Sequence, residues 1–447
     1  MKNPLRFVTA IAFAAGSAIL PGMAKAEQDI TAEAAAPCPP LPAWDSSIQQ
    51  DPQNSKALVS RGEAYSDKGA FACAIADFTA ALALTPPDSD DGAAILTRRS
   101  AAYAAKGDLD LAIADISAVI QLTPYDAAPL YTRGTLRAKK SDFAEAIDDY
   151  SDAVARDPQN ARAFLGRGEA YAKLNDDQHA TDDFNQALKL DPKLAAAYQD
   201  LGLIYQAGGD SGQAISYFNQ AIAIDPRLLA ARVNRGKVFL ATGQFDLAIE
   251  DYTQALDIDA HSAPSFAGRA VAYRARGDLA RAAADLGQAT ALDPGDADNF
   301  FNLGLVNYFT GKYSDALRAF ARSTELTADA NAKFYPAFWA WLAKAKLGFN
   351  GLTVFSRVMT GMDSSNWPAP IAALYQGSLA PADLPAAAAQ EDQRCEAWFY
   401  QGEWYLQHNR QDLAMAAFKA AIATGDFHRA EYDAARFELG RLGEKLD

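Results

Sequence analysis

Apolar residues recur along most of this chain as pairs of short amphipathic segments joined by a turn. In the stretch RGEAYSDKGAFACAIADFTAALALTP, from Arg61 to Pro86, apolar residues follow one another at helical spacing on both sides of Gly69. This spacing is typical of one face of an α-helix, and glycine is common at the joint between two elements. The stretch therefore predicts a hairpin of two amphipathic helices.

The hairpin pattern returns with a period of 34 residues. In the unit that starts at Ala161, large residues stand at positions 4, 11 and 24, small residues at 8, 20 and 27, and proline at 32. We predict eight such units and a ninth after an interruption, at 55–88, 93–126, 127–160, 161–194, 195–228, 229–262, 263–296, 297–330 and 395–428. A four-residue insertion separates the first two units.

The units resemble the tetratricopeptide repeat, whose signature is this period with small residues at positions 8, 20 and 27. In that repeat the small residues lie where the two helices approach most closely, and the aromatic residues fill the space between helices. The resemblance implies an all-α fold, an α-solenoid of helix-turn-helix repeats stacked as a right-handed superhelix with a concave groove. A C-terminal capping helix is expected over residues 429–447, where the sequence is amphipathic and rich in charge.

Two charges recur on otherwise apolar faces of the repeats. Six units carry arginine at position 7 and aspartate at position 23, and the other three lack both. Because the two residues occur together, we predict ion pairs between the two helices of one repeat, partly covered by stacking. Catalytic aspartates would require six equivalent active sites, so a structural role is favoured. The predicted pairs are Arg61 and Asp77, Arg99 and Asp115, Arg133 and Asp149, Arg167 and Asp183, Arg235 and Asp251, and Arg269 and Asp285.

The first helices of units five to eight place apolar residues at positions that face the concave groove of such a repeat. Exposed apolar runs of this kind are typical of contact sites, so we expect a groove for an extended or helical segment of a partner. The alternative is that the C-terminal segment or a second subunit covers it. The candidate groove residues are Leu203, Val233, Leu240, Val271, Phe301, Leu305, Tyr308 and Phe309.

The first 26 residues differ in character from the rest of the chain. Lys2 and Arg6 precede a 14-residue apolar run, and the sequence AKA ends at Ala26. This pattern predicts a secretory signal peptide, residues 1–26, cleaved after Ala26, followed by an N-terminal extension over 27–54. We therefore expect a soluble periplasmic protein without a membrane span. The alternative is an uncleaved membrane anchor.

The three cysteines, Cys38, Cys73 and Cys395, have no metal-ligand spacing. In an oxidising compartment Cys38 and Cys73 could form a disulfide, if the segment after Cys38 folds back on the first repeat. The alternative is three isolated thiols.

The formal net charge is −15, which disfavours nucleic acid and anionic lipid as partners. The four histidines also lack metal-ligand spacing, and no phosphate loop or nucleophile motif appears. The segment GGDSG, 208–212, falls at an expected turn between repeat helices, where glycine and aspartate are ordinary. We expect no metal, no cofactor and no enzymatic activity.

Residues 331–394 break the period and predict a degenerate helical pair and a linker. From about Phe334 to Gly443 the sequence resembles NlpI-type periplasmic repeat proteins. The matching residues are Trp367, Pro368, Gly377, Phe399, Tyr400, Gly402, Tyr432, Glu438 and Leu439. This resemblance implies a dimeric, non-enzymatic adaptor that brings peptidoglycan hydrolases and a processing protease together.

Our main functional hypothesis is a periplasmic scaffold that binds other proteins or peptides, with envelope hydrolases or a protease as suspected partners. The second is a structural or self-assembling protein, such as a homodimer, whose groove is filled by its own chain. A third, weaker hypothesis is a glycan-handling enzyme with an unrecognised site.

Overall fold

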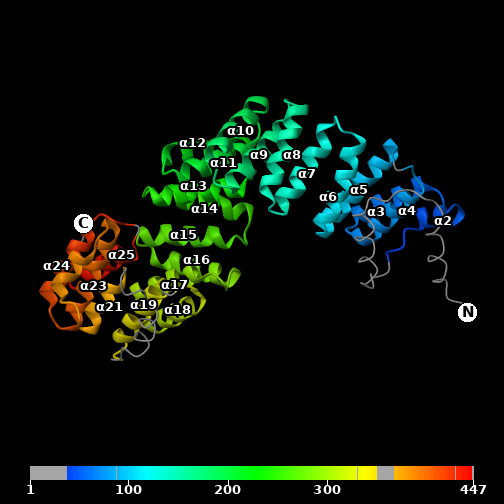
Figure 1. Cartoon of the computed structure of the whole chain (residues 1–447). Coiled ribbons are helices and arrows are strands. Elements are labelled where there is room, and N and C mark those ends of the chain that lie inside the picture. The colour runs from blue at the N-terminus through cyan, green and yellow to red at the C-terminus, as the bar shows by residue number, and fades with distance from the viewer. Residues whose placement is uncertain (1–37, 87, 330, 350–366, 428, 445–447) are drawn as a thin grey trace, which may run out of the picture. The chain divides into compact units, whose positions relative to one another are not determined.

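The computed structural model describes residues 38–86, 88–329, 331–349, 367–427 and 429–444. Within these ranges all regular structure is helical and no strand occurs (Figure 1). The predicted fold class, an all-α solenoid of helical repeats, is confirmed. The predicted signal peptide and its cleavage site after Ala26 lie outside the described residues. The chain divides into two compact units, residues 1–192 and 193–447, which are described separately.

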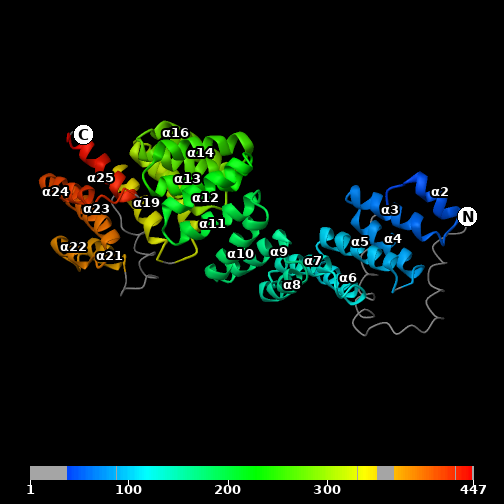
Figure 2. The ribbon, with the colours of Figure 1, turned by 90° about the horizontal axis from the view of Figure 1, so that it is seen from above.

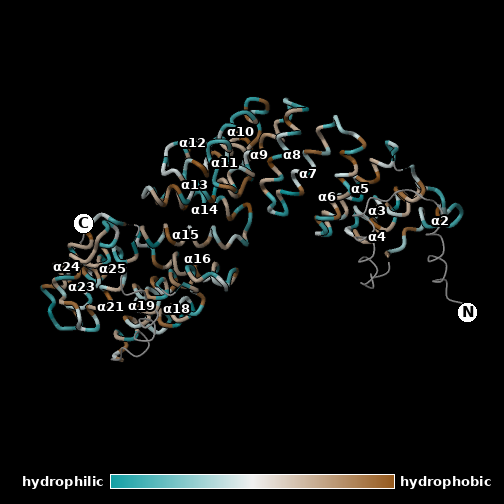
Figure 3. Tube along the Cα trace, viewed as in Figure 1, coloured by the Kyte–Doolittle hydropathy of each residue, from teal (hydrophilic) through white to brown (hydrophobic). Residues whose placement is uncertain are grey.

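The first unit begins with α2 (Pro42–Gln50) and continues as four helical hairpins. Along α7 and α8, hydrophobic and hydrophilic positions alternate as the tube in Figure 3 turns. Each first helix except α5 begins at the first residue of a predicted repeat, whereas α5 begins three residues earlier, inside the insertion. The hairpin helices are α3 (Ser55–Asp67), α4 (Phe71–Ala83), α5 (Asp90–Lys106), α6 (Leu109–Leu122), α7 (Ala127–Lys139), α8 (Phe143–Arg156), α9 (Ala161–Lys173) and α10 (Asp177–Leu190).

The second unit contains four more regular hairpins and then a less regular C-terminal segment. In this segment α23, α24 and α25 contact one another and lie side by side in both views (Figures 1 and 2). The regular helices are α11 (Ala195–Ala207), α12 (Ser211–Ile224), α13 (Leu229–Ala241), α14 (Phe245–Ile258), α15 (Ala263–Ala275), α16 (Leu279–Leu292), α17 (Ala297–Phe309) and α18 (Tyr313–Leu326). The C-terminal segment contains α19 (Phe334–Lys346), α21 (Ala369–Gln376), η1 (Pro381–Asp383), α22 (Leu384–Ala387), α23 (Glu391–Gln407), α24 (Gln411–Ala423) and α25 (Ala430–Arg441).

A contact between a glycine and an aromatic ring sets the spacing of the two helices in a hairpin. A Cβ atom on Gly168 would lie 2.7 Å from the ring of Phe184, and one on Gly202 would lie 2.6 Å from the ring of Phe218. Real Cβ atoms do not approach a ring this closely, because interiors are already close-packed. Phe184 and Phe218 are fully buried. Position 8 therefore needs glycine wherever an aromatic residue occupies position 24.

The six predicted arginine–aspartate pairs all lie within hydrogen-bonding distance. In the fourth repeat, Nε of Arg167 donates to Oδ2 of Asp183 at 2.7 Å, and Nη2 donates to Oδ1 at 2.8 Å. Such two-pronged contacts are characteristic of arginine with a carboxylate. Each aspartate is buried. The other pairs have the same arrangement: Arg61 with Asp77, Arg99 with Asp115, Arg133 with Asp149, Arg235 with Asp251 and Arg269 with Asp285.

The third nitrogen of each guanidinium group, Nη1, reaches the preceding repeat, which sequence analysis did not predict. Nη1 of Arg167 donates to Oγ of Ser151 at 3.1 Å, from the second helix of the repeat before it. One arginine thus joins both helices of its own repeat to the neighbouring repeat. The equivalent contacts run from Arg99 to Thr79, Arg133 to Ser117, Arg235 to Asn219 and Arg269 to Thr253.

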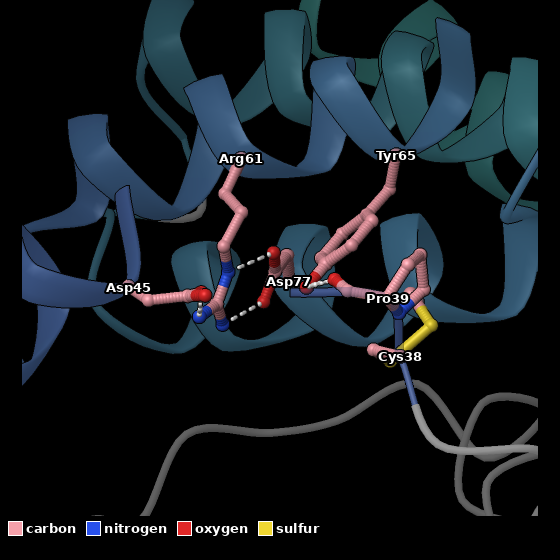
Figure 4. The surroundings of a disulfide bond; sticks show 7 residues. Cys38, Pro39, Asp45, Arg61, Tyr65 and Asp77 are labelled. Atoms are coloured by element: carbon pink, nitrogen blue, oxygen red, sulfur yellow. Dashed lines mark hydrogen bonds and ion pairs between the residues drawn. A yellow bond between two sulfur atoms is a disulfide. The ribbon is translucent and has the colours of Figure 1, made fainter. Parts of the chain in front are cut away.

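The first repeat has no repeat before it, and α2 takes that place. Nη1 of Arg61 donates to Oδ1 of Asp45 in α2 at 2.9 Å (Figure 4). Leu41 is buried, and Trp44 and Ile48 pack against the core of the first two repeats. Segment 38–50 therefore caps the N-terminal end of the array.

A disulfide between Cys38 and Cys73 fixes the start of this cap. Beside it, the Tyr65 hydroxyl donates to the carbonyl oxygen of Pro39 at 3.1 Å (Figure 4). Cys395 is a buried free thiol. Of the two alternatives left by the sequence, the structure contains the pairing of Cys38 with Cys73.

We expect Arg167→Leu to lower the free energy of unfolding by about 3 kcal/mol, because it leaves the buried carboxylate of Asp183 without its cation. Adding Asp183→Leu should restore much of this loss. The measurement is urea denaturation of the intact chain, with Arg162→Leu, an exposed position on the same helix, as the control. A double variant as unstable as the sum of the two single variants would contradict the pairing.

We also expect reduction of the disulfide to destabilise the N-terminal end. The bond joins residues 35 apart, and closing a loop of this length stabilises a chain by roughly 4 kcal/mol. Reductant should therefore lower the melting temperature of the natural chain and of Cys395→Ser. It should leave the melting temperature of Cys38→Ser/Cys73→Ser unchanged. Equal sensitivity of the double variant to reductant would exclude this bond as the cause.

Candidate protein-interaction surface

The eight candidate groove residues all belong to the second unit, but four of them are not exposed. Leu305, Tyr308, Phe309 and Val233 are buried. The prediction that these four side chains offer a free contact surface is therefore wrong.

The C-terminal segment buries three of the four. The ring of Tyr308 meets that of Trp339 in α19 edge to face, with centroids 5.3 Å apart. The ring of Phe309 lies 5.4 Å from that of Phe437 in α25. Leu305 belongs to the same cluster of buried apolar side chains. The alternative that the C-terminal segment covers the groove therefore holds for this end of the unit.

Val233 is buried for a different reason. It belongs to a cluster with Phe239 and Tyr252 between the hairpins α13–α14 and α15–α16. Position 5 of this repeat therefore contributes to packing between repeats. The pattern of apolar residues alone does not separate this role from a contact role.

The other four side chains retain exposed surface. Leu203 is 38% exposed, and Leu240, Val271 and Phe301 are partly exposed. They stand on α11, α13, α15 and α17, the first helices of four successive repeats. These four, called the groove residues below, form the candidate interaction surface.

A cavity of about 340 Å³ lies beside Phe301. Phe301 and Leu305 contribute apolar surface to its wall, and Arg274, Tyr335, Glu396 and Glu431 contribute polar surface. Glu396 and Glu431 are 1% and 4% exposed, although glutamate is seldom so buried unless it is paired.

The carboxyl group of Glu396 accepts three hydrogen bonds. The donors are Nη1 of Arg429 at 2.9 Å, the Tyr335 hydroxyl at 3.0 Å and Nε1 of Trp367 at 2.8 Å. Burial, and next the neighbouring Glu431, nevertheless raise the pKa of Glu396 to about 8. Burial also raises the pKa of Glu431, whose Oε1 accepts a hydrogen bond from the Tyr400 hydroxyl at 2.7 Å.

A second buried pair, Glu403 and Glu438, lies further along the same two helices. Nζ of Lys346 lies 3.9 Å from Glu403 and 3.0 Å from Glu438. Burial, and next the charge of Glu438, raise the pKa of Glu403 to about 8. Burial by itself would lower the pKa of Lys346, but the two glutamates outweigh it and raise that pKa.

Sequence analysis did not single out the four glutamates as a group. The available signal was their spacing, because Glu396 and Glu403, and likewise Glu431 and Glu438, stand seven residues apart. Seven residues are about two helical turns, so each pair shares one helix face.

The residues considered for catalysis have ordinary structural surroundings. Nδ1 of His179 lies 2.8 Å from Oδ2 of Asp176, and Asp210 of GGDSG caps α12 by accepting from the backbone N–H of Gln213. In the described part of the chain, no three histidine, cysteine, aspartate or glutamate side chains are grouped to hold a metal ion. The same residues include no helix long and apolar enough to cross a bilayer.

Comparison with protein families identifies the repeat. The tetratricopeptide repeat family model matches residues 131–195 and 200–263. A second model, described as TPR repeat, matches residues 270–311. No curated protein matches the sequence significantly.

Several solved structures are similar in fold. A tetratricopeptide repeat protein from Parabacteroides merdae is 21% identical over 57% of this chain and 99% of that protein, with a TM-score of 0.46. PilW, described as a widely conserved type IV pilus biogenesis factor, is 23% identical over 44% and 92%, with a TM-score of 0.41. YrrB, described as a TPR protein with an unusual peptide-binding site, is 20% identical over 44% and 97%, with a TM-score of 0.38.

At these identities and TM-scores, no property of the three proteins transfers to this chain. The family matches rest on the sequence itself, and they fall on α7 to α17, where the helices follow the 34-residue period. This chain therefore contains tetratricopeptide repeats, as its period predicts.

Proposed function

We propose that this chain is a scaffold that binds other proteins through its groove residues. Tetratricopeptide repeat proteins generally mediate contacts between proteins. The observation that carries the proposal is the exposed apolar surface of Leu203, Leu240, Val271 and Phe301, on the first helices of four successive repeats. Apolar side chains repeated in this way suit an extended or helical segment of a partner.

We propose further that the scaffold works in the periplasm as an adaptor for envelope enzymes. The disulfide between Cys38 and Cys73 supports an oxidising compartment, where such bonds persist. The resemblance of the C-terminal half to NlpI-type proteins supports peptidoglycan hydrolases or a processing protease as the partners.

A second candidate function is self-assembly as a homodimer. The observation in its favour is that the chain already covers part of its own groove, at Leu305, Tyr308 and Phe309. Light scattering separates the two candidates. A stable dimer that captures no other protein would favour self-assembly, and a monomer would exclude it.

The main proposal is tested by photo-crosslinking in living cells. A photoreactive residue at Leu203 or Val271 should capture partner proteins, whereas one at Leu247 should not. Leu247 is the matched control because it is 43% exposed but stands on a second helix, α14, whereas the groove residues stand on first helices.

Adding Leu240→Asp should lower the crosslinking yield at Leu203 roughly thirtyfold, the effect of losing about 2 kcal/mol at an interface centre. Mass spectrometry of the captured chains gives the partners. Unchanged yield in this variant, or the same proteins captured at Leu247, would contradict binding through the groove residues.

A further inference from the structure

The two buried glutamate pairs have the same arrangement but different surroundings. Helix α23 carries Glu396 and Glu403, and α25 carries Glu431 and Glu438. Equal spacing on two contacting helices gives two levels, each with one glutamate from each helix. Glu396 and Glu431 form the outer level, which lines the cavity, and Glu403 and Glu438 form the inner level, which does not.

The inner level contains as many cations as carboxyl groups. Nζ of Lys346 contacts both Glu403 and Glu438, and Nη1 of Arg441 lies 3.3 Å from Glu438. At the inner level, a lysine ammonium group therefore lies between two buried glutamates and compensates their charge. It matters there because an unpaired buried charge is strongly destabilising.

The outer level is one cation short. Arg429 contacts Glu396 at 2.9 Å, and within the described residues no other ion pair involves Glu396 or Glu431. Arg274 also lines the cavity, but it is paired with Asp433 of α25. The cavity thus adjoins the level where no lysine is present.

We propose that the cavity receives a primary ammonium group of a bound protein, held by Glu396 and Glu431. The group would come from a lysine side chain or from a free amino terminus. This inference rests on the proposed function, because it names the chemistry of the partner segment that the groove residues bind.

The dimensions and lining of the cavity suit such a group. A volume of about 340 Å³ is at the small end of ligand sites, which take one side chain or a small molecule. Phe301 and Leu305 provide apolar surface for the methylene chain of lysine, whose charged end can then reach the carboxyl groups. An ammonium group has three donors and no acceptor, which matches two carboxyl groups. The net charge of −15 favours encounter with cationic segments.

Binding should depend on pH. The titratable groups around the outer pair are Arg429, Arg274, Tyr335, Tyr400, Cys395 and Asp298. Because the pKa of Glu396 is raised to about 8, the pair holds a proton at neutral pH, which the ammonium group displaces. Affinity should therefore fall by up to about tenfold for each pH unit below 8, and binding should release a proton.

The experiment uses the whole chain and small probes, so it does not depend on a partner. N-acetyl-lysine methylamide offers the side-chain ammonium group, and alanine methylamide offers an α-ammonium group. N-acetyl-norleucine methylamide has an aliphatic chain without the charge, and acetate tests anion binding. Calorimetry gives the affinity, and the NMR signal of the Trp367 indole N–H, which donates to Glu396, reports the location.

We expect at least one ammonium probe to bind and to shift the Trp367 signal, and the probe that binds more tightly identifies the source of the group. Glu431→Gln should weaken this binding at least about tenfold, the effect of losing one charge-assisted contact. Glu403→Gln, the matched control at the inner level, should change it less than about twofold. Asn302→Lys, which places an ammonium group at the cavity wall and keeps both glutamates, should also abolish probe binding.

Three results would overturn the inference. The first is that the norleucine probe binds as tightly as the ammonium probes. The second is that acetate binds and the amines do not. The third is that Glu431→Gln and Glu403→Gln lose equal affinity for the ammonium probes. Failure of the probes with intact crosslinking at Leu203 would reject this site alone. Binding of the probes without any crosslinking would instead reject the proposed function.

Discussion

An aromatic ring that rests on a glycine of the opposite helix fixes the geometry of most hairpins in this protein. Because the rings of Phe184 and Phe218 lie where a Cβ atom would be, the two helix backbones come as close as side chains allow. The neighbouring positions, one residue before the glycine and one before the ring, then face each other across the hairpin. Arginine and aspartate at those positions meet in a two-pronged contact, as Arg167 and Asp183 do. The helix spacing thus determines where the charges lie.

The arginine contacts also show what sequence can and cannot predict here. The pairing within a repeat was predictable, because Arg167 and Asp183 recur together at a fixed separation in one hairpin. The third contact, to Ser151, depends on how one hairpin sits on the next, and a serine on a helix surface does not by itself indicate a partner. The burial of Phe309 was not predictable either, because it requires knowing where α25, more than a hundred residues later, packs. Positions within the period predict local structure, whereas exposure depends on the path of the irregular C-terminal segment.

The C-terminal segment combines tight packing with buried charge. Rings from α17, α19 and α23 pack against one another around Trp339, and the glutamates of α23 and α25 lie beside them. Removing a carboxyl group from water is costly unless cations or protons neutralise it. At the inner level Lys346 and Arg441 contact the carboxyl groups, and at the outer level Arg429 contacts the carboxyl group of Glu396. The same helices therefore support a cluster of ion pairs at one level and a cavity lined by carboxyl groups at the next.

The cap formed by α2 has a consequence for the ends of the array. Stacked repeats could in principle continue from one molecule to another, since every hairpin presents a surface shaped to receive a further hairpin. At the N-terminal end, Asp45 accepts the hydrogen bond from Nη1 of Arg61, the atom that contacts the preceding repeat elsewhere in the array. The disulfide between Cys38 and Cys73 holds the cap to the first repeat. A second molecule would have to displace this covalently tethered helix before it could stack there. The cap thus keeps the array finite at this end and prevents head-to-tail filaments from growing from it.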